Sequence, residues 1–226
     1  MFDTYQFQKI NTQNSSQMEK VRQFLLSMGL GIDADVEFFV VALSSSVIVG
    51  CAGLAGNTLK SIAVSPDLQG TGLSTRLLTE VVTHAYDMGR YNLFIYTKPD
   101  NYRMFHEAGF HQLTAVKDRV ILLENSKTRL QEHCEKLSSF AQPGEKIGSI
   151  VMNANPFTNG HRYLVKHASE NCDWVHLFVV KEDRSFFSYS DRLNMIKAGV
   201  KEFKNVTVHA GSDYIISRAT FPSYFL

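Results

Sequence analysis

The spacing of apolar residues predicts a helix followed by three strands near the start of the chain. Ser16 and Glu19 have the S-x-x-E spacing of a capping box, and apolar residues recur after them at helical intervals. Three apolar runs follow at residues 38–43, 47–54 and 59–64, separated by turn-forming residues. This order predicts an antiparallel meander.

The third run leads into a glycine-rich loop and a second helix. Residues 65–74 read SPDLQGTGLS, and an amphipathic pattern then extends from Leu77 to Met88. A glycine-rich loop at the start of a helix turns main-chain N–H groups toward an anion. The loop is therefore a candidate phosphate cradle, and a further strand is predicted at residues 93–97.

The second half of the chain alternates between strand and helix patterns. An apolar run ends at residues 150–151, and a helical pattern follows Gly160. Residues 174–180, WVHLFVV, are almost uninterruptedly apolar, as a buried parallel strand requires. A second helical pattern begins at Tyr189, and a third apolar run spans residues 206–209. The alternation predicts a Rossmann-like half sheet.

A connecting segment separates the two halves. Residues 126–140 carry apolar residues on one helical face, and the sequence AQPGE at residues 141–145 ends that pattern. We therefore expect a first domain at residues 1–125, a connecting helix and linker at residues 126–144, and a second domain at residues 145–226.

The loop after the first strand of the second half contains a T-x-G-H sequence, formed by Thr158, Gly160 and His161. A helix that begins near Gly160 directs unpaired N–H groups and the positive end of its dipole into the loop, which favours an anion. The Thr158 hydroxyl can donate to a phosphate oxygen, and His161 can supply a proton or positive charge. In the alternative interpretation, Gly160 makes a tight turn and His161 is a polar residue of the first helical turn.

Composition excludes several classes of protein. The 226 residues carry a net charge of +1 and no basic run, which argues against a nucleic-acid binder. Cys51, Cys134 and Cys172 lack the spacing of a metal site and indicate reduced thiols. The N-terminus lacks the pattern of a signal peptide, and no apolar run reaches membrane-spanning length. We therefore expect a cytoplasmic protein without a membrane partner.

With a strand before it and a helix after it, the T-x-G-H sequence resembles the (H/T)xGH signature of the nucleotidyltransferase superfamily. The resemblance implies that the turn binds the triphosphate of ATP and that Thr158 and His161 catalyse attack on the α-phosphorus. It also implies ATP contacts from Asn155, Pro156, Phe157 and Gly160. Lys181 and Arg184 follow the next strand at the end where open α/β sheets bind ligands, so they can contact phosphate. A solvated charged loop is an equal alternative for these two residues.

The Q-G-T-G-L-S loop resembles motif A of the GNAT acetyltransferases, whose main-chain N–H groups hold the pyrophosphate of coenzyme A. Gln69 and Gly72 match the family pattern (Q/R)-x-x-G-x-(G/A), and Ser74 stands where Gly or Ala is usual. Residues 101–110, which end in Gly-Phe, resemble the family's next segment. The resemblance implies contacts to a CoA-like arm from Val64, Gln69, Gly70, Thr71, Gly72, Leu73, Ser74 and Asn101.

Phe105 stands where many of these acetyltransferases have a tyrosine that protonates the leaving thiolate. Phenylalanine has no proton to donate, and because a one-residue shift turns a side chain to another face of a helix, neither Tyr102 nor His106 is a clear replacement. We therefore expect Phe105 to be a core residue, and this unit to bind a CoA-like group rather than to acetylate an amine.

The whole chain is similar to the citrate lyase ligase family, in which a GNAT-like α+β domain precedes a Rossmann-like nucleotidyltransferase α/β domain. The resemblance implies that ATP, with Mg²⁺, and acetate form acetyl-AMP. The acetyl group then passes to the thiol of the CoA-derived prosthetic group on the acyl carrier subunit of citrate lyase, and AMP and diphosphate are released. Chains of this family continue further and carry a late I-S-x-(S/T)-x-(V/I)-R motif. Residues 216–220, ISRAT, differ from that motif, so we expect the second domain to be truncated.

Two other classes of function remain open. In a stand-alone acetyltransferase, acetyl-CoA turnover with an amine would be unaffected by His161→Ala. A non-catalytic binder of the carrier subunit would bind that subunit without releasing AMP. Neither alternative accounts for the NPFTNGH turn at residues 155–161, so the ligase is the hypothesis that we favour.

Overall fold

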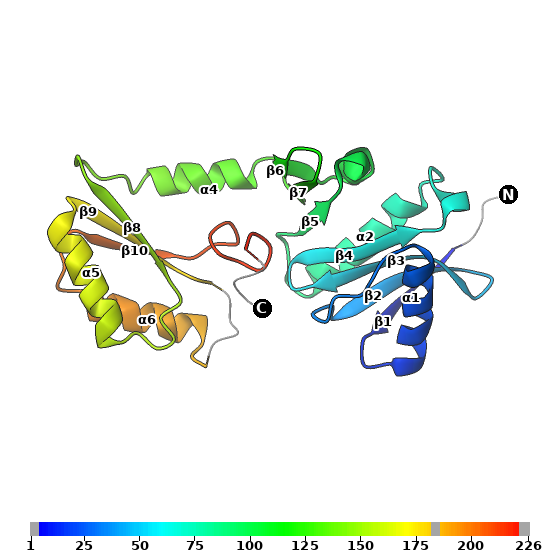
Figure 1. Ribbon diagram of the computed structural model, residues 1–226, viewed down its shortest axis with the longest axis horizontal. Helices are drawn as coiled ribbons and strands as arrows, with labels where there is room; N and C mark the ends of the chain where they lie inside the picture. The colour runs from blue at the N-terminus through cyan, green and yellow to red at the C-terminus, as the bar shows by residue number, and fades with distance from the viewer. Residues whose placement is uncertain (1–4, 182–185, 222–226) are drawn as a thin grey trace. The chain divides into compact units, whose positions relative to one another are not determined.

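The computed structural model describes residues 5–181 and 186–221 of the chain. The chain divides into two compact units, Met1–Leu130 and Gln131–Leu226 (Figure 1). Each unit has its own apolar core.

The first unit is a seven-stranded sheet with helices on both faces (Figure 1). Its elements are, in chain order, β1 (Gln6–Asn11), α1 (Ser15–Ser27), β2 (Phe38–Ser44), β3 (Val47–Ala55), β4 (Thr58–Val64), the 3-10 helix η1 (Pro66–Leu68), α2 (Leu73–Asp87), β5 (Phe94–Thr97), the 3-10 helix η2 (Pro99–Asn101), α3 (Tyr102–Glu107), β6 (His111–Val116) and β7 (Val120–Glu124). The strand order is β1-β2-β3-β4-β5-β7-β6, and neighbours are antiparallel except β4 and β5. The predicted meander and GNAT-like α+β fold are confirmed.

The parallel pair of β4 and β5 opens like a wedge. The pairing joins only Thr58 to Phe94 and Leu59 to Ile95. Because β4 continues to Val64 and β5 to Thr97, the rest of each strand diverges from the other. The wedge leaves room for a ligand between two strands whose backbones can form hydrogen bonds.

Two apolar clusters stabilise this unit, one on each face of the sheet. Helix α2 contributes Leu77 and Val81 to one cluster, and α1 contributes Val21 and Leu25 to the other. All four side chains are fully buried. Burial of a side chain of this size contributes about 1.5–3 kcal/mol each, so both helices are fixed by packing against the sheet.

The predicted capping box of α1 is wrong. The helix begins at Ser15, and its N-cap is Asn14, whose side-chain oxygen accepts a hydrogen bond from the main-chain N–H of Gln17 at 3.2 Å. Ser16 and Glu19 consequently lie inside the helix. Asparagine is among the most favourable N-cap residues, and its position two residues earlier lets it cap the first turn in place of Ser16.

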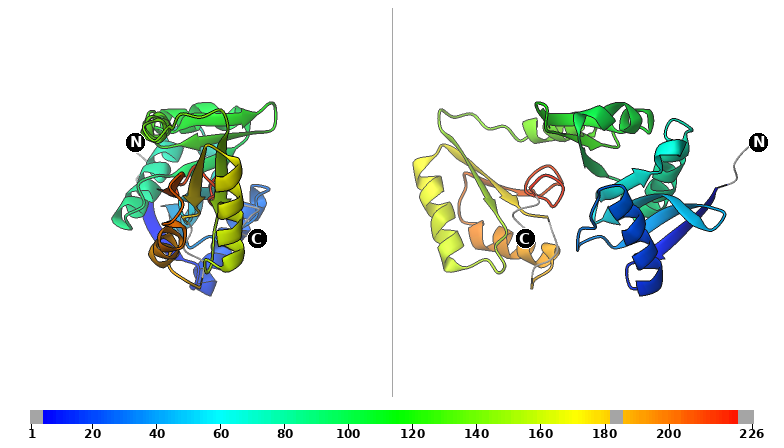
Figure 2. Two further views of the ribbon diagram at one scale, coloured as in Figure 1. Left: turned by 90° about the vertical axis from the view of Figure 1, so that its left-hand side faces the viewer. Right: turned by 45° about the vertical axis from the view of Figure 1, so that its right-hand side comes forward.

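The second unit is a three-stranded parallel sheet with two helices on one face (Figure 2). Its elements are α4 (Arg129–Ser138), which begins at the end of the first unit, β8 (Ile147–Met152), α5 (Asn159–Asn171), β9 (Trp174–Val179), α6 (Tyr189–Val200) and β10 (Val206–Ala210). The strand order is β10-β9-β8. Both crossovers advance in the same direction, so right-handed connections place α5 and α6 on the same face. The predicted Rossmann-like half sheet is confirmed.

The opposite face of this sheet carries a pair of histidines. Nδ1 of His176 on β9 lies 2.8 Å from Nε2 of His209 on β10. The ring of Phe178 stacks on His209, and the edge of Phe140 meets it at a centroid distance of 5.1 Å. Burial, together with the neighbouring His176, lowers the pKa of His209. On this face, the neutral imidazole of His209 therefore packs among aromatic rings.

The helices that pack against the sheets are short and bury one apolar side. The α2 helix has 15 residues, five of them buried. None of the helices formed by residues 5–181 and 186–221 has the length and apolar character that crossing a bilayer requires.

Leu177→Ala tests the core of the second unit. Leu177 lies on the central strand β9 and is 0% exposed, so its truncation is expected to destabilise this unit by about 2–5 kcal/mol. Trp174, the sole tryptophan of the chain, lies on the same strand, and its fluorescence during urea unfolding measures the change. The control is Leu164→Ala on α5, where the side chain is 49% exposed and a change below about 1 kcal/mol is expected. If both variants lost the same free energy of unfolding, the burial of Leu177 in the core would be contradicted.

Candidate functional site

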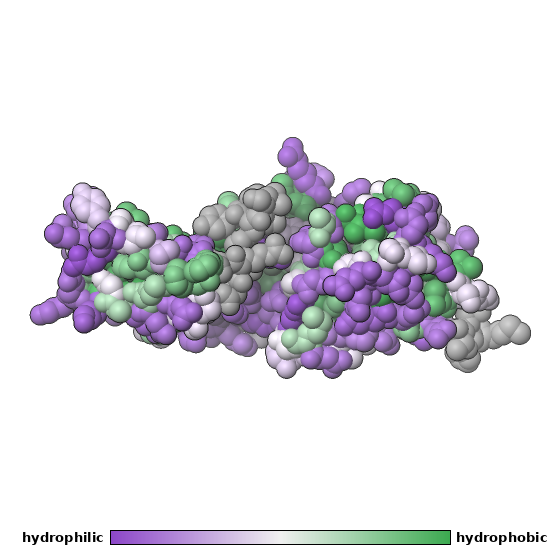
Figure 3. Space-filling view, turned by 90° about the horizontal axis from the view of Figure 1, so that it is seen from below, coloured by the Kyte–Doolittle hydropathy of each residue, from purple (hydrophilic) through white to green (hydrophobic). Residues whose placement is uncertain are grey.

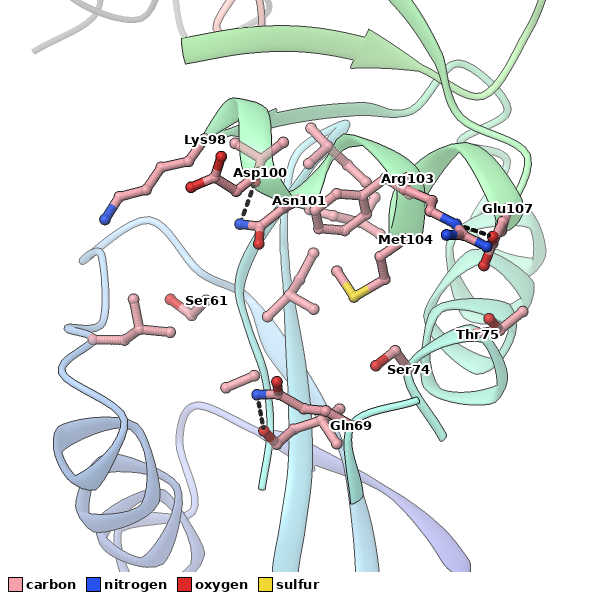
Figure 4. Close-up of a pocket in the computed structure, with 18 of the residues that line it drawn as sticks. Ser61, Gln69, Ser74, Thr75, Lys98, Asp100, Asn101, Arg103, Met104 and Glu107 are labelled. Carbon is pink, nitrogen blue, oxygen red and sulfur yellow. Dashed lines mark hydrogen bonds and ion pairs between the residues drawn. The ribbon is translucent and has the colours of Figure 1, made fainter. Parts of the chain in front are cut away.

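A cleft of about 970 Å³ lies in the wedge of the first unit (Figure 4). Residues 59–64 of β4 form one wall, and residues 95–98 at the end of β5 form another. The glycine-rich loop before α2 and one side of α3 complete the lining. The wedge, the loop and a helix N-terminus therefore converge on one space.

Six of the eight residues predicted to hold a CoA-like arm line this cleft: Val64, Gln69, Gly70, Gly72, Ser74 and Asn101. The amide nitrogen of Gln69 donates to the main-chain oxygen of Val64 at 3.5 Å. The amide nitrogen of Asn101 donates to Oγ1 of Thr97 at 2.9 Å. Figure 4 shows Gln69 and Ser74 on one side of the cleft and Asn101 across from them.

The structure places Thr71 and Leu73 differently. Among the described residues, neither belongs to the lining of the cleft. The Thr71 hydroxyl donates to the main-chain oxygen of Leu68 at 2.7 Å, and Leu73, the first residue of α2, is buried in the apolar core. A ligand contact from either residue would therefore come from the main chain, and both assignments stay predictions.

The N-terminus of α2 is suited to an anion. Its N-cap is Gly72, which has a φ of +82° and no side-chain capping bond. This left-handed conformation is accessible to glycine at little cost. Because no side chain caps the helix, the N–H groups of its first turn have no partner within the helix and remain available to a phosphate.

The cleft is lined by several polar residues that the sequence did not single out, among them Lys60 and Tyr96, because only the wedge brings their strands to one space. Lys60 contacts Asp33 at 3.0 Å and Asp35 at 2.9 Å. Burial acts to lower the pKa of Lys60, but hydrogen bonds to the two carboxylates outweigh it, so the pKa is raised and the amine stays charged. Burial raises the pKa of Tyr96, so its hydroxyl keeps its proton at neutral pH.

Phe105 is a core residue, as expected. It is 3% exposed and packs in the apolar cluster that includes α2. Tyr102 and His106 stand with their rings 5.3 Å apart on α3, and among the described residues neither belongs to the lining of the cleft. The described part of α3 therefore offers no proton donor at the position where many GNAT acetyltransferases have a tyrosine.

In the second unit, Thr158 and His161 form the N-terminus of α5. Thr158 is the N-cap, and the two residues make a capping box. The main-chain N–H of Thr158 donates to Nδ1 of His161 at 3.1 Å, and Oγ1 of Thr158 lies 2.8 Å from the same nitrogen. Since Nδ1 accepts a hydrogen bond, the neutral ring carries its proton on Nε2. His161 thus helps to cap the helix through Nδ1 and carries a proton on Nε2.

The capping box changes the role expected for the Thr158 hydroxyl. In this arrangement the hydroxyl donates to Nδ1 of His161, which lacks a proton. Its donor is then occupied, whereas the N–H groups of Asn159 and Gly160 have no partner within the first turn of the helix. A phosphate at this turn would meet main-chain donors first.

Gly160 leaves open space before this helix. A Cβ at position 160 would meet only Oγ1 of Thr158, at 3.7 Å, which is an ordinary contact. The surrounding protein therefore does not require glycine here for steric reasons. The open space is consistent with a different reason for glycine, namely that a ligand approaches the main chain closely.

The loop between β8 and α5 is fastened to the segment before α6. The side-chain oxygen of Asn155 accepts a hydrogen bond from the main-chain N–H of Phe187 at 3.0 Å. Pro156 is exposed, and Phe157 is half-buried against the apolar core. Of these three residues predicted to contact ATP, Asn155 and Phe157 already have structural partners.

Two cations were predicted at the end of β9. Lys181 follows the strand, is half-exposed, and lies 3.7 Å from Oδ1 of Asp213. Arg184 lies outside the described residues. A phosphate contact from either residue stays a prediction.

Arg192 on α6 supports the loops of this site, and the sequence did not single it out. It is 0% exposed, and its Nη1 donates to the main-chain and side-chain oxygens of Asn153, at 3.0 and 2.8 Å, and to the main-chain oxygen of Val180 at 2.9 Å. Its Nε donates to the oxygen of Phe187 at 3.3 Å. One guanidinium thus joins the ends of β8 and β9 to the segment before α6. In sequence it appears only as one of several charged residues in a helical pattern.

Comparison with protein families matches each half of the chain separately. Residues 3–120 match the acetyltransferase (GNAT) domain, and residues 147–226 match the citrate lyase ligase C-terminal domain. The first match contains the cleft, and the second contains the Thr158–His161 turn.

Three similar proteins are each described as citrate (pro-3S)-lyase ligase. The one from Klebsiella pneumoniae is 53% identical over 208 residues, which is 92% of this chain and 61% of the relative. The one from Escherichia coli is 46% identical over 226 residues, 100% of this chain and 64% of the relative. The one from Haemophilus influenzae is 48% identical over 222 residues, 98% of this chain and 66% of the relative. The chain spans less than two thirds of the length of each.

Arg192→Lys tests whether the several N–H donors of the guanidinium group are needed to hold the loops at the end of this sheet. A lysine ammonium cannot reach Asn153, Val180 and Phe187 together, so buried acceptors would lose their donor. The expected cost is about 2–3 kcal/mol, measured by urea unfolding with Trp174 fluorescence. As a control, Arg162→Lys alters an exposed ion pair with Glu202 and should cost less than about 1 kcal/mol. An Arg192→Lys variant as stable as the control would show that these bonds do not hold the loops.

Proposed function

Since the chain belongs to the acetyltransferase (GNAT) domain family and carries a citrate lyase ligase C-terminal domain, we propose that it works as an ATP-dependent acid–thiol ligase acting on citrate lyase. Acetate is activated as acetyl-AMP. The acetyl group then moves to the thiol of the CoA-derived prosthetic group on the acyl carrier subunit. AMP and diphosphate are the other products.

The second unit supports the first step. A carboxylate oxygen of acetate attacks the α-phosphorus of ATP, the bond to the β-phosphate oxygen breaks, and diphosphate leaves. Negative charge grows on the phosphoryl oxygens as this happens. Main-chain N–H groups at the start of α5 and the Nε2 proton of His161 are donors that can stabilise that charge.

Magnesium would enter this step with the nucleotide. Among the described residues, no group of three or more His, Cys, Asp and Glu side chains is arranged to hold a metal ion. The phosphates of ATP are themselves good ligands for Mg²⁺, which often keeps several waters and few protein ligands. The ion would therefore neutralise the diphosphate as it leaves.

The first unit supports the second step. The thiol loses its proton, the thiolate attacks the acetyl carbonyl carbon, and the bond to AMP breaks. A pantetheine arm has amide groups that can pair with the free strand edges of the wedge, and a diphosphate can bind at the uncapped N-terminus of α2. The buried Phe105 agrees with a unit that holds this arm without acting as an acetyltransferase.

Two binding units in one chain raise the local concentration of one reactant near the other. Acetyl-AMP is a reactive mixed anhydride, so early capture by a tethered thiol limits its loss to water. The single observation that carries the proposal is the paired Thr158 and His161 at the start of α5, because neither an amine acetyltransferase nor a passive binder requires it.

His161→Ala tests the first step. Loss of the Nε2 donor is expected to lower acetate-dependent exchange of diphosphate into ATP by at least about 100-fold. The control is His167→Ala, on the exposed side of the same helix, which should retain exchange. Acetyl-CoA turnover with an amine that survives His161→Ala would favour an acetyltransferase instead. Binding of the carrier subunit by the unaltered chain without AMP release would favour a passive binder.

Gly72→Ala tests the cradle of the first unit. At a φ of +82°, alanine is strained by about 1 kcal/mol, and relief of that strain shifts the loop. Affinity for dephospho-CoA, measured by isothermal titration calorimetry, is expected to fall by about 5- to 10-fold. Gly89→Ala is a matched control, since Gly89 has a φ of +74° and equally open surroundings but lies after α2. Equal loss of affinity in both variants would mean that the effect is one of stability alone.

A further inference from the structure

We propose that Gly199 and Phe157 are positioning residues that hold the imidazole ring of His161 in one orientation. Neither residue needs to touch the substrate in this role. The orientation of the His161 ring is a property of the ligand-free protein, whereas the expected effect on turnover rests on the proposed ligase function.

Two contacts define the ring of His161. Its Nδ1 edge is held by the main-chain N–H and the hydroxyl of Thr158. Its face lies against the ring of Phe157, with a centroid distance of 5.8 Å and an angle of 25° between the rings. One edge and one face are thus occupied, and the remaining edge carries the Nε2 proton.

Phe157 is itself held by a glycine on another helix. A Cβ at position 199 of α6 would stand 2.7 Å from Cδ1 of Phe157, and closer still to Cε1. No side chain fits between the helix and the ring, so the ring lies directly on the helix backbone. Glycine is among the poorest helix formers, and this contact gives a physical reason for its presence one residue before the end of α6.

Helix α6 therefore fixes the loop between β8 and α5 at two points. Arg192 holds Asn153 at the start of the loop, and Gly199 seats Phe157 near its end. Positions 192 and 199 are seven residues apart, which places them on the same face of a helix. A rigid helix that holds both ends of the loop limits how far His161 can move.

The surface of this unit carries hydrophobic as well as hydrophilic residues. Figure 3 shows a band of hydrophobic residues across the second unit, between hydrophilic ones. Phe157 and His161 are both half-buried. Phe157 was expected to contact ATP, and its packing on Gly199 supports a role behind His161 instead.

Gly199→Ala tests the proposal. The new methyl group displaces the Phe157 ring, and the ring of His161 loses its support. We expect the ¹⁵N signals of the His161 ring nitrogens in the ligand-free protein to shift toward a mixture of tautomers. Those signals are identified by their loss in His161→Ala. We also expect kcat for diphosphate exchange to fall by about 10- to 100-fold while KM for ATP changes less than about twofold, since misplacement of a catalytic group acts on the transition state.

Two further variants separate positioning from stability. Asn194→Ala, at an exposed position of the same helix, raises helix propensity as Gly199→Ala does but lies outside the contact. It should leave the His161 signals unchanged. Phe157→Ala removes the ring that the new methyl group would strike. In a protein that already carries Phe157→Ala, adding Gly199→Ala should therefore change neither the His161 signals nor kcat any further. The reason is that Gly199 acts on His161 through Phe157.

Two results would overturn the proposal. One is a folded Gly199→Ala protein, with the Trp174 unfolding transition of the unaltered chain, whose His161 signals do not move. The other is an effect of Gly199→Ala that is equally large with and without Phe157. Absence of diphosphate exchange in every variant would refute the ligase instead, and the spectra of the ligand-free protein would still decide the positioning role.

Discussion

The hydrogen bond from the main-chain N–H of Thr158 to Nδ1 of His161 is the contact on which the proposed chemistry of the second unit depends. It fixes the neutral tautomer, because a nitrogen that accepts from the main chain has no proton of its own. It also forms only when α5 begins at Asn159, so the secondary structure and the protonation pattern of the ring are linked. A change that moved the helix start by one residue would break both.

Most of the fold could be predicted from sequence because its strongest signals are local. Residues 38–64 and 147–210 alternate apolar and turn-forming segments, and the structure has strands and helices there. The strands β1 and β6 lacked such a signal, since β1 buries only Ile10 and β6 buries no side chain. The cap of α1 was predicted at Ser16 because both Asn14 and Ser16 are good N-caps, and sequence alone does not rank their geometry.

The candidate sites were predictable only in part, because their supporting residues come from distant segments. The motifs at Gly72 and His161 are short and local, so sequence shows them. The contacts that hold the loop before His161 join residues about 40 positions apart, as with Arg192 and Asn153. Lys60 and Tyr96 share a cleft only because two parallel strands diverge. Such positions look like ordinary charged or apolar residues until the sheet is assembled.

The two helix N-termini differ in a way that matches the proposed division of labour. Gly72 caps α2 with no side chain, which leaves only main-chain donors in fixed positions. Such a site can hold a diphosphate but has no group that exchanges a proton. Thr158 caps α5 together with His161, so the same kind of terminus gains an imidazole that can act during bond breaking. In the proposed division of labour, one kind of structural element thus supplies both a binding site and a reactive site, and the two differ in the side chains of the first helical turn.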